Sequence, residues 1–331
     1  MLAHLHIENS RLGSPLSHAH DEHVRAALIR HKFLADRVRI TIGWDGDMLD
    51  AALATAQFLI AARPPRDNLS ARAPGLRWIQ TTGAGIDHLL PLDWLPDDII
   101  LTNNSGPHGP KCEEFCLMAL LALSARLPTL VDQQRARRWS SIFTQPIAGK
   151  TCLVIGYGDI GQAAVRAAKR LGLTAIAVSR SGSGAGSSTG PADRLMPTSA
   201  LDSVLPEADF VVIAAPLTPQ TRDLLSRARL ARLRPAAGLV NVARAPLVDY
   251  DAMSDMLRGG RLGGAVIDVQ DPEPLPADSP LWEVPNLILT PHISCDDPRY
   301  VDMLLDAWAA NLTRYLAGET LRNVVDRSRG Y

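Results

Sequence analysis

Three ionisable side chains suited to binding and protonating a small acid lie in the second half of the chain. Arg244 follows Asn-Val-Ala, Glu273 lies in Asp-Pro-Glu-Pro, and His292 lies in Leu-Thr-Pro-His-Ile. An imidazole exchanges protons near neutral pH, and a guanidinium matches the geometry of a carboxylate. Each follows a predicted strand, and the carboxyl ends of parallel strands form the ligand crevice of a doubly wound sheet. Taken singly, each is equally compatible with a surface salt bridge or a satisfied histidine; together they predict one site.

A glycine-rich segment predicts a dinucleotide site. The segment Val-Ile-Gly-Tyr-Gly-Asp-Ile-Gly ends at Gly161, follows an apolar run and opens a helical pattern. In such a G-x-G-x-x-G loop, Gly156 permits the tight turn, Gly158 lets the backbone approach a pyrophosphate, and Gly161 lets the helix pack on the strand. Glycines also end strands for plain turn reasons, so the strand–turn–helix context carries the prediction. The predicted cofactor contacts here are Gly156, Tyr157, Gly158, Asp159, Ile160 and Gly161.

The end of the next predicted strand distinguishes NAD from NADP. Proteins that bind NAD place Asp or Glu there, against the ribose 2′-hydroxyl. Here the strand ends in Ser179-Arg180-Ser181, and the next acid is Asp193. Arg180 suits a 2′-phosphate, and the two serines suit hydrogen bonds to it. We therefore expect NADP(H) as the preferred cofactor, with NAD(H) still possible, since Arg180 is also compatible with a solvated residue stacked on adenine.

Short apolar runs alternate with helical patterns along the whole chain, which predicts an α/β fold with parallel sheets. Helical patterns cover 21–33, 47–54, 113–127 and 298–316. Several later runs are continuously apolar, as expected for strands buried on both faces. The segment 181–190 is rich in Ser and Gly and predicts a flexible loop. The predicted strands are 38–42, 58–61, 78–80, 99–101, 151–155, 174–178, 210–214, 238–242, 265–269 and 287–289.

Over essentially its whole length the chain resembles the D-isomer-specific 2-hydroxyacid dehydrogenase family. The resemblance rests on the glycine loop, on Pro-Leu-Thr-Pro-Gln-Thr at 216–221, and on the motifs around Arg244, Glu273 and His292. Within the family the chain looks most like glyoxylate/hydroxypyruvate reductases and their NADPH-preferring relatives. The reaction implied is hydride transfer between NADPH and a small 2-oxo acid, giving the D-2-hydroxy acid.

The three ionisable residues suit that reaction. Reduction of a carbonyl needs a proton at oxygen, which His292 can donate. Glu273 is expected to bind the other ring nitrogen and favour the imidazolium, while Arg244 binds the carboxylate and polarises the carbonyl oxygen. Of these, Arg244 and His292 are also expected to contact substrate.

Further contacts are implied by the resemblance alone. The loop Thr-Thr-Gly-Ala-Gly-Ile resembles the family's substrate-carboxylate loop, with Ala84 and Gly85 at the binding positions, although a plain glycine-rich turn remains an alternative. Arg63 is more compatible with a solvated residue than with a substrate contact. Additional cofactor positions are Pro216, Thr221, Val242, Ala243, Asp268 and Ser294.

Several residues depart from the family pattern or have no assigned role. Asp296 and Asp297 follow the His292 motif and put the substrate preference in doubt. His108 suits a hinge better than a cleft wall, and Cys295 suits an inert buried thiol. Trp139 fits core packing at least as well as a contact across a dimer interface.

The resemblance implies two Rossmann-like domains with an active-site cleft between them. The substrate domain, flavodoxin-like, is expected to combine 1–103 with 298–331, and the cofactor domain to cover 104–297. No regulatory domain is expected beyond these. A homodimer is also implied.

Composition excludes several classes of protein. The 331 residues carry a net charge of −1, with 46% apolar and 21% charged residues, which argues against nucleic-acid and membrane partners. The first residues do not form a signal peptide, and the four cysteines show no paired metal-site spacing, so we expect reduced thiols, no metal and a cytoplasmic location.

Two alternatives remain open. One is an NAD-linked D-2-hydroxyacid dehydrogenase for another acid, such as D-lactate or phosphoglycerate, against which Arg180 counts. The other is a dinucleotide-sensing binding protein, like the corepressors of this fold. A sensor has no need of Arg244, Glu273 and His292, and the chain lacks a long docking tail.

Overall fold

The computed structural model describes residues 2–12, 14–182 and 190–331, and it divides into two compact units. One unit comprises Met1–Pro107 with Asp297–Tyr331, and the other comprises His108–Asp296. The chain therefore leaves the first unit after Pro107, four residues later than expected, and re-enters it at Asp297. Most of the loop predicted at 181–190 lies outside the described residues.

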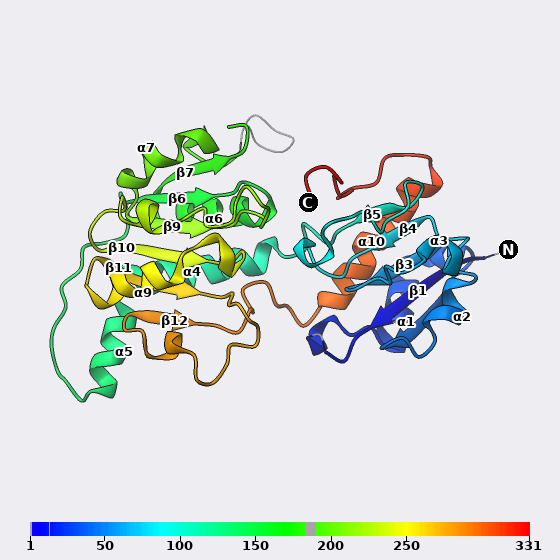
Figure 1. The fold of residues 1–331 in the computed structure, drawn as a ribbon, viewed down its shortest axis with the longest axis horizontal. Helices are drawn as coiled ribbons and strands as arrows, with labels where there is room; N and C mark the ends of the chain where they lie inside the picture. Colours follow the sequence, from blue (N-terminus) through cyan, green and yellow to red (C-terminus); the bar gives the residue numbers. More distant parts are fainter. Residues whose placement is uncertain (1, 13, 183–189) are drawn as a thin grey trace. The chain divides into compact units, whose positions relative to one another are not determined.

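The first unit is built on a five-stranded parallel sheet of order β2-β1-β3-β4-β5 (Figure 1). Its strands are β1 Ala3–Asn9, β2 Val38–Trp44, β3 Phe58–Ala61, β4 Trp78–Gln80 and β5 Ile100–Thr102. Its helices are α1 Asp21–Arg30, α2 Leu49–Leu53, α3 Leu69–Arg72 and α10 Tyr300–Leu316.

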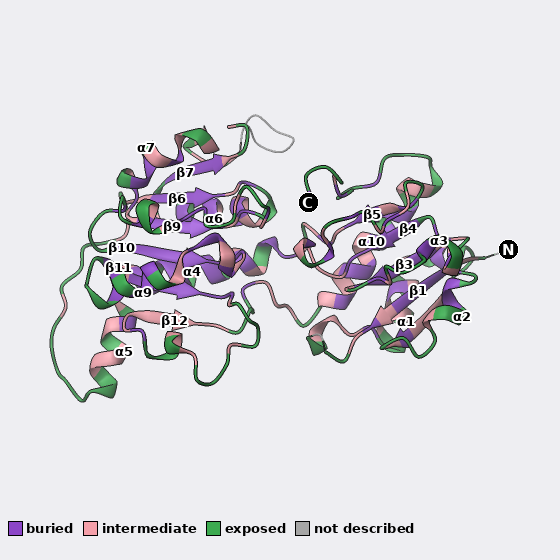
Figure 2. Ribbon diagram, viewed as in Figure 1, coloured by how far each residue is buried: buried purple, intermediate pink, exposed green. Residues whose placement is uncertain are grey.

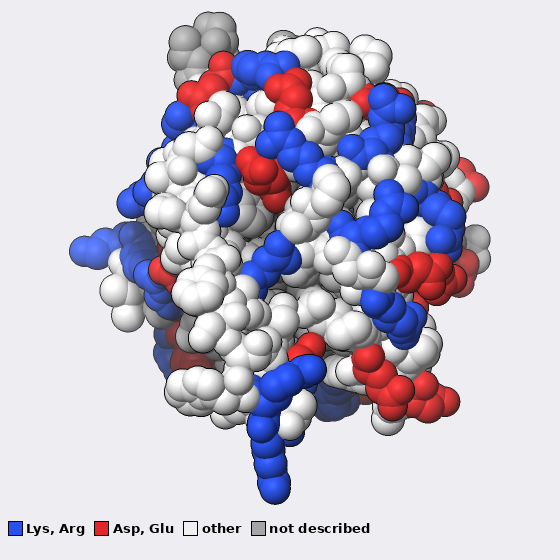
Figure 3. All heavy atoms as spheres, turned by 90° about the vertical axis from the view of Figure 1, so that its left-hand side faces the viewer, with Lys and Arg blue, Asp and Glu red and all other residues white. Residues whose placement is uncertain are grey.

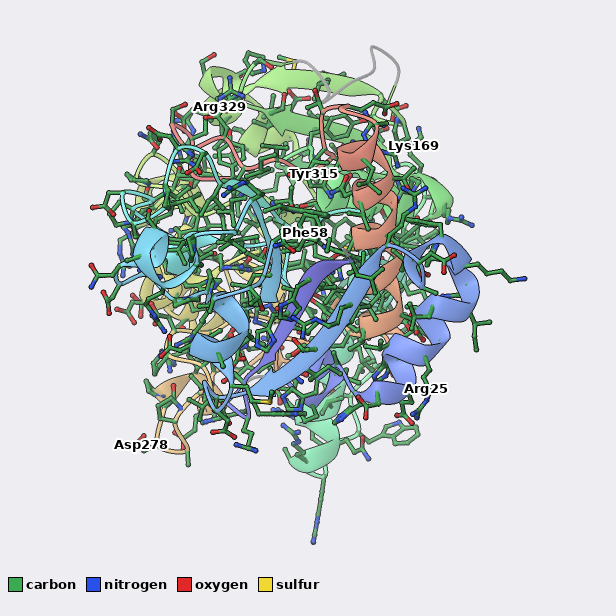
Figure 4. All side chains as sticks on the ribbon, turned by 90° about the vertical axis from the view of Figure 1, so that its right-hand side faces the viewer. Arg25, Phe58, Lys169, Asp278, Tyr315 and Arg329 are labelled. Carbon is green, nitrogen blue, oxygen red and sulfur yellow. The ribbon has the colours of Figure 1, made fainter. Side chains whose placement is uncertain are left out.

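Aromatic packing attaches α10 to this sheet although the whole second unit lies between them in sequence. Trp308 stacks on Trp78 of β4 with ring centroids 5.6 Å apart and planes 9° from parallel. Tyr315 meets Phe58 of β3 edge-on at 5.4 Å (Figure 4). Because both tryptophans are almost fully buried, the C-terminal helix is part of the core of this unit.

Strand β1 was not predicted from the sequence, and its side chains show why. His4, His6 and Glu8 alternate with Leu5 and Ile7, so the apolar run is broken. His4 and His6 are nonetheless buried, because Thr41 bridges them, 2.7 Å from Nε2 of His4 and 2.9 Å from Nδ1 of His6. Burial lowers the pKa of His4 to about 4, which keeps that ring neutral.

The second unit contains a seven-stranded parallel sheet of order β12-β11-β10-β9-β6-β7-β8. Its strands appear buried in Figure 2, apart from those at the edges. They are β6 Thr151–Ile155, β7 Thr174–Ser179, β8 Arg194–Pro197, β9 Phe210–Ile213, β10 Ala237–Asn241, β11 Leu262–Ile267 and β12 Leu287–Leu289.

Successive residues of these strands enter two different cores. Leu153, Val211 and Leu239 face one core, whereas Val154, Val212 and Val240 face the other. Helices therefore cover both faces, which explains the continuously apolar runs. The helices are α4 Gly109–Ser124, α5 Leu127–Arg135, α6 Asp159–Arg170, α7 Leu201–Val204, α8 Arg227–Leu230 and α9 Tyr250–Arg258.

Most expected elements are present with shifted ends. The strands at 58–61, 78–80, 151–155 and 287–289 agree with their predicted bounds, while β11 begins and ends earlier than predicted. The helix expected at 113–127 instead covers Gly109–Ser124, and α5 and β8 were not predicted. Within the described residues no single helix is long and apolar enough to cross a membrane; α4 and α5 reach that length and composition only as a pair bent by 65°.

Candidate active site

The glycine loop joins β6 to α6, as the motif predicts. Gly156 has φ +101°, and a side chain there would place Cβ 2.5 Å from the Ala214 carbonyl oxygen. A Cβ at Gly161 would lie 2.0 Å from the Gly156 oxygen, so helix and loop approach too closely for any other residue. Gly158, in contrast, has nothing within 4 Å of a Cβ position. The backbone at Gly158 and the start of α6 are therefore accessible to a phosphate.

The six loop residues do not all present side chains to this space. The Tyr157 side chain is buried in the core beneath α6, and its hydroxyl accepts a hydrogen bond from the Ala192 N–H at 3.3 Å. Only the backbone of Tyr157 is left to contact a cofactor. Asp159 and Ile160 form the first turn of α6.

The strand end after β7 carries Arg180 and no carboxylate. Ser179 is the last strand residue, and Arg180 is exposed. Asp193, the next acid along the chain, binds Lys169 at 2.6 Å and accepts from the Ala175 N–H at 2.8 Å. Ala175 lies near the start of β7, so Asp193 is engaged near the opposite end of this strand from Arg180.

Asp268 organises the loop that carries His292. Its buried carboxylate accepts hydrogen bonds from Thr290 Oγ1 at 2.5 Å, from Ile293 N at 2.9 Å and from Ser294 N at 2.8 Å. Its carbonyl oxygen accepts from His292 N at 2.9 Å. These bonds hold His292 in a left-handed conformation, with φ 55°.

His292 and Glu273 form the predicted pair. The distance from His292 Nδ1 to Glu273 Oε2 is 2.8 Å, and Glu273 Oε1 accepts from the Gln270 N–H at 2.9 Å. The hydrogen bond to Glu273 raises the pKa of His292 above its ordinary value, against the effect of partial burial. Burial disfavours the charged form of Glu273, but hydrogen bonds from His292 and the Gln270 amide outweigh it and lower its pKa. The pair therefore favours imidazolium and carboxylate, and within the described part of the chain Nε2 of His292 forms no hydrogen bond.

Arg244 lies close enough to this pair to act on both charges. It lowers the pKa of Glu273 and opposes protonation of His292. Its Nη1 donates to the Ala243 oxygen at 2.7 Å. Arg244, Glu273 and His292 follow β10, β11 and β12, which are neighbours in the sheet, so the structure brings the three predicted residues to one edge.

A polar network that the sequence analysis missed ties two of these loops together. Asn241 Nδ2 donates to the Arg244 oxygen at 2.9 Å and to Tyr250 Oη at 3.0 Å. Tyr250 Oη donates to the Val269 oxygen at 2.8 Å, at the start of the loop to Glu273. Gln270 Nε2 extends the network to the Thr290 oxygen at 3.2 Å. Only the order of the strands could reveal these contacts, since the residues are far apart in sequence.

The other predicted cofactor positions serve mainly local structure. Thr221 Oγ1 donates to the Pro216 oxygen at 2.8 Å and so closes the turn after β9. Val242 and Ala243 are almost fully buried, and Ser294 is 2% exposed.

The predicted substrate loop belongs to the first unit and follows β4. Tyr300 Oη donates to the Thr82 oxygen at 2.8 Å, and Asn104 N donates to the Gly83 oxygen at 3.0 Å. Among the described residues, no group accepts a hydrogen bond from the Ala84 or Gly85 amide. These amides are therefore available to an anion.

Trp139 does not pack in the core, so that prediction is wrong. The residue is 100% exposed, because the segment between α5 and β6 leaves the core. Arg63 is exposed. His108 is buried at the start of α4. Cys295 is partly buried, and a hydrogen bond with Cys112 raises the pKa of the Cys295 thiol. Burial raises the pKa of Asp296.

A parallel sheet whose edge carries both a dinucleotide-type loop and an imidazole held by a carboxylate defines the class: a dinucleotide-dependent dehydrogenase. Residues 117–294 match the family model for the D-isomer specific 2-hydroxyacid dehydrogenase, NAD binding domain. The chain belongs to this family and is an NAD(P)-dependent D-2-hydroxyacid dehydrogenase or reductase.

Relatives support this assignment over most of the chain. Glyoxylate/hydroxypyruvate reductase B of Pectobacterium carotovorum is 32% identical, covering 92% of this chain and 98% of that protein. D-3-phosphoglycerate dehydrogenase of Mycobacterium tuberculosis is 31% identical over 88% of this chain, which spans only 55% of that protein.

Two solved structures share the fold. A D-isomer specific 2-hydroxyacid dehydrogenase from Xanthobacter autotrophicus, in complex with NADPH and MES, has a TM-score of 0.84 at 31% identity, with both chains covered completely. The NADPH-dependent glyoxylate/hydroxypyruvate reductase of Sinorhizobium meliloti, in complex with NADP and sulfate, has a TM-score of 0.81 at 26% identity, with 99% of each chain covered.

Proposed function

We propose that the enzyme uses NADPH to reduce a small 2-oxo acid of the glyoxylate or hydroxypyruvate kind to the D-2-hydroxy acid. The observation that carries this proposal is the 2.8 Å contact between His292 Nδ1 and Glu273 Oε2, with Arg244 close by. This contact supports a protonated His292 whose second ring nitrogen, Nε2, faces a ligand. The names of the Pectobacterium and Sinorhizobium relatives point to the same substrate class.

The proposed roles follow from charge and geometry. A bound nicotinamide cofactor would supply the hydride that the carbonyl carbon needs. His292 Nε2 donates the proton that the carbonyl oxygen needs, and Glu273 stabilises the imidazolium before that transfer. In the reverse reaction neutral His292 accepts the hydroxyl proton.

Arg244 and the loop of the first unit bind the substrate in this proposal. Arg244 holds the carboxylate and stabilises negative charge on the carbonyl oxygen. The Ala84 and Gly85 amides donate further hydrogen bonds to the carboxylate. We assign the first unit as the substrate domain and the second as the cofactor domain, which contains the matched NAD-binding region.

Two features favour NADPH over NADH. The end of β7 carries Arg180 rather than an acid, and Asp193 is held by Lys169 and Ala175 N. A carboxylate at the strand end repels a 2′-phosphate, whereas a guanidinium pairs with it. The NADPH complex of the Xanthobacter relative agrees with this preference.

Oxidation of NADPH or NADH with glyoxylate, hydroxypyruvate, pyruvate, phenylpyruvate and 3-phosphohydroxypyruvate tests the proposal. We expect turnover of glyoxylate or hydroxypyruvate with NADPH, and a loss of roughly 10²–10⁴-fold in the His292→Ala variant. Turnover with NADH alone contradicts the cofactor assignment. Turnover of phosphohydroxypyruvate alone contradicts the substrate class, and undiminished turnover in the variant contradicts the site.

We also propose a homodimer. Trp139 and Phe143 are 100% and 95% exposed, and Leu127 and Leu130 of α5 are partly exposed nearby in sequence. Exposed large apolar side chains that gather within one segment of the chain are unfavourable in water and indicate an interface. Sedimentation velocity is expected to give twice the chain mass of 35.7 kDa, and Trp139→Ser with Phe143→Ser to give the monomer. A monomeric wild-type protein contradicts the proposal.

A further inference from the structure

Gln270 lies between the two loops that carry Glu273 and His292. Its side-chain Nε2 donates to the Ile267 oxygen and to the Thr290 oxygen, in each case at 3.2 Å. Ile267 is the last residue of β11, and Thr290 directly follows β12, the strand that pairs with β11. The side-chain amide of Gln270 thus joins the ends of two neighbouring strands at the point where their loops begin.

Backbone groups connect the same residue to both members of the Glu273–His292 pair. The Gln270 N–H donates to Glu273 Oε1 at 2.9 Å. The Thr290 oxygen, which accepts from Gln270 Nε2, also accepts from the His292 N–H at 3.0 Å. Gln270 is therefore bonded directly to the carboxylate and, through one carbonyl oxygen, to the residue that carries the imidazole.

These contacts require a side-chain amide of this length. Both partners of Gln270 Nε2 are carbonyl oxygens, so an acceptor in its place is repelled, and a group with two N–H donors serves both. Gln270 Oε1 accepts no hydrogen bond within the part of the chain that the structure describes. The Ile267 oxygen also accepts from the Thr290 N–H at 3.0 Å, which continues the β11–β12 ladder. The amide of Gln270 therefore adds one further rung to this ladder, formed by a side chain.

The charged groups that act on the pKa of His292 are local. The hydrogen bond to Glu273 raises this pKa and partial burial lowers it, while the charge of Arg244 lowers it and that of Asp268 raises it. Asp296 also lies within electrostatic reach of His292.

Distant charges have little effect on this pair. Figure 3 shows the opposite end of the second unit, where the strands begin and where lysine and arginine side chains lie with acids among them. A strand of five residues such as β6 is roughly 16 Å long, which exceeds the Debye length of about 8–10 Å. A change in the pKa of His292 therefore reports on the local geometry of the pair.

We propose that Gln270 is a positioning residue, which sets the separation of the two loops and thereby the contact between Glu273 Oε2 and His292 Nδ1. The inference rests on the proposed function for the roles of these two residues, and it adds the group that holds them 2.8 Å apart. Displacement of either loop lengthens the contact. A misplacement of about 1 Å in an active site costs roughly 10²-fold in rate.

Gln270→Met tests the proposal, because methionine has a similar length and no N–H donor. We expect kcat for reduction with NADPH to fall roughly tenfold to a hundredfold, with the KM for NADPH unchanged. We also expect a lower pKa for His292, because the contact with Glu273 that raises it is loosened. An NMR titration of the imidazole Cε1–H resonance measures this pKa, and the absence of that resonance in His292→Ala assigns it. The alkaline fall of the reduction rate is expected to move to lower pH with it.

Gln57→Met is the matched control. In the first unit, directly before β3, Gln57 Nε2 donates to the Thr55 oxygen at 3.1 Å and Oε1 accepts from the His4 N–H at 2.7 Å. The same substitution there removes backbone contacts of the same kind, and it is expected to lower Tm while leaving kcat and the pKa of His292 unaltered. Gln270→Asn is the second variant: it keeps the amide but is one methylene shorter, so it is expected to behave like Gln270→Met.

The NMR titration needs no substrate, so it separates this proposal from the proposed function. A lower pKa of His292 in Gln270→Met supports the positioning role even if none of the tested 2-oxo acids is reduced, in which case the proposed function alone fails. The positioning role is overturned if both Gln270 variants titrate like the wild type, whether or not kcat falls. It is also overturned if Gln57→Met lowers the pKa of His292 equally, since the shift then reflects a general loosening of the protein.

Discussion

Asp268 accepts hydrogen bonds from the backbone amides of Ile293 and Ser294 through different carboxylate oxygens, at 2.9 and 2.8 Å. The two hydrogen bonds to Asp268 therefore hold His292 in its left-handed conformation without a bound ligand. The imidazole is held at the end of β12 before a substrate arrives. Such preorganisation supports proton transfer, because little reorganisation remains to be done.

Replacing Asp268 tests this preorganisation. Asp268→Asn keeps the size of the side chain but places an NH₂ group where an acceptor is needed. Because the carboxylate is fully buried, we expect a loss of about 2–4 kcal/mol of unfolding free energy. This corresponds to a fall in Tm of roughly 5–15 °C, measured by calorimetry. An unchanged Tm contradicts the role of Asp268 in the loop.

The pair Glu273–His292 predicts a specific pH dependence. Protonated His292 is needed for reduction, so the rate is high below its pKa and is lost as pH rises through it. Glu273 raises that pKa, and Glu273→Gln is therefore expected to move the alkaline fall of kcat/KM to lower pH. The oxidation rate, which needs neutral imidazole, is expected to extend to lower pH. Rates at constant ionic strength between pH 5 and pH 10 measure both limbs.

One outcome contradicts the argument that the charge of Glu273 raises the pKa of His292. If Glu273→Gln lowers the rate by the same factor at every pH, Glu273 acts only by orienting the ring. The charge argument is then wrong, although the contact remains. Asp296→Asn is the matched control, since it removes a nearby carboxylate that does not hydrogen-bond His292.

Arg180 is expected to set the cofactor preference. In Arg180→Ala, the KM for NADPH is expected to rise roughly tenfold or more, because an ion pair with the 2′-phosphate is lost. The KM for NADH is expected to change little. Initial rates with both cofactors give the ratio directly. An equal rise for both shows that Arg180 contacts adenine or serves structure, and not the phosphate.

Tyr250 is expected to act as a positioning residue. Tyr250→Phe removes the hydroxyl that joins Asn241 to the Val269 oxygen, at a cost of about 1–3 kcal/mol. Because Val269 begins the loop to Glu273, we expect kcat to fall and the alkaline limb to shift as in Glu273→Gln, with the Kd for NADPH unchanged.

Tyr315→Phe provides the comparison for Tyr250, since it removes a hydroxyl from the aromatic core of the first unit. It is expected to leave the pH profile unaltered. A stability loss in Tyr250→Phe with an unshifted pH profile restricts Tyr250 to a purely structural role.

Local sequence signals predicted most of the strands and indicated that Arg244, Glu273 and His292 follow strands of one sheet, whereas the roles of these three residues stay predictions. Strands such as β6 and β9 are continuous apolar runs, and the glycine loop has steric requirements that only glycine meets. Arg244, Glu273 and His292 could be picked out because each lies in the loop that follows a strand of a parallel sheet. β1 was not predicted because its buried histidines depend on hydrogen bonds with Thr41, which lies in another strand.

Contacts that depend on the order of the strands in the sheet could not be predicted from the sequence. The contacts of Asn241 with Tyr250, and of Tyr250 with the Val269 oxygen, exist because β10 and β11 are neighbours. Of the two interpretations of Trp139, core packing was wrong although aromatic residues are usually buried, and a contact across a dimer interface stays a prediction.

The packing of α10 against β3 and β4 also sets an order of events during synthesis. The first unit lacks Trp308 and Tyr315 until residues 300–316 have been made, whereas the second unit is complete in sequence at Asp296. Domains generally fold as units while the chain emerges from the ribosome. The unit that begins the chain is thus expected to be the last to fold, and its exposed β1–β5 sheet must wait for the inserted unit to be translated.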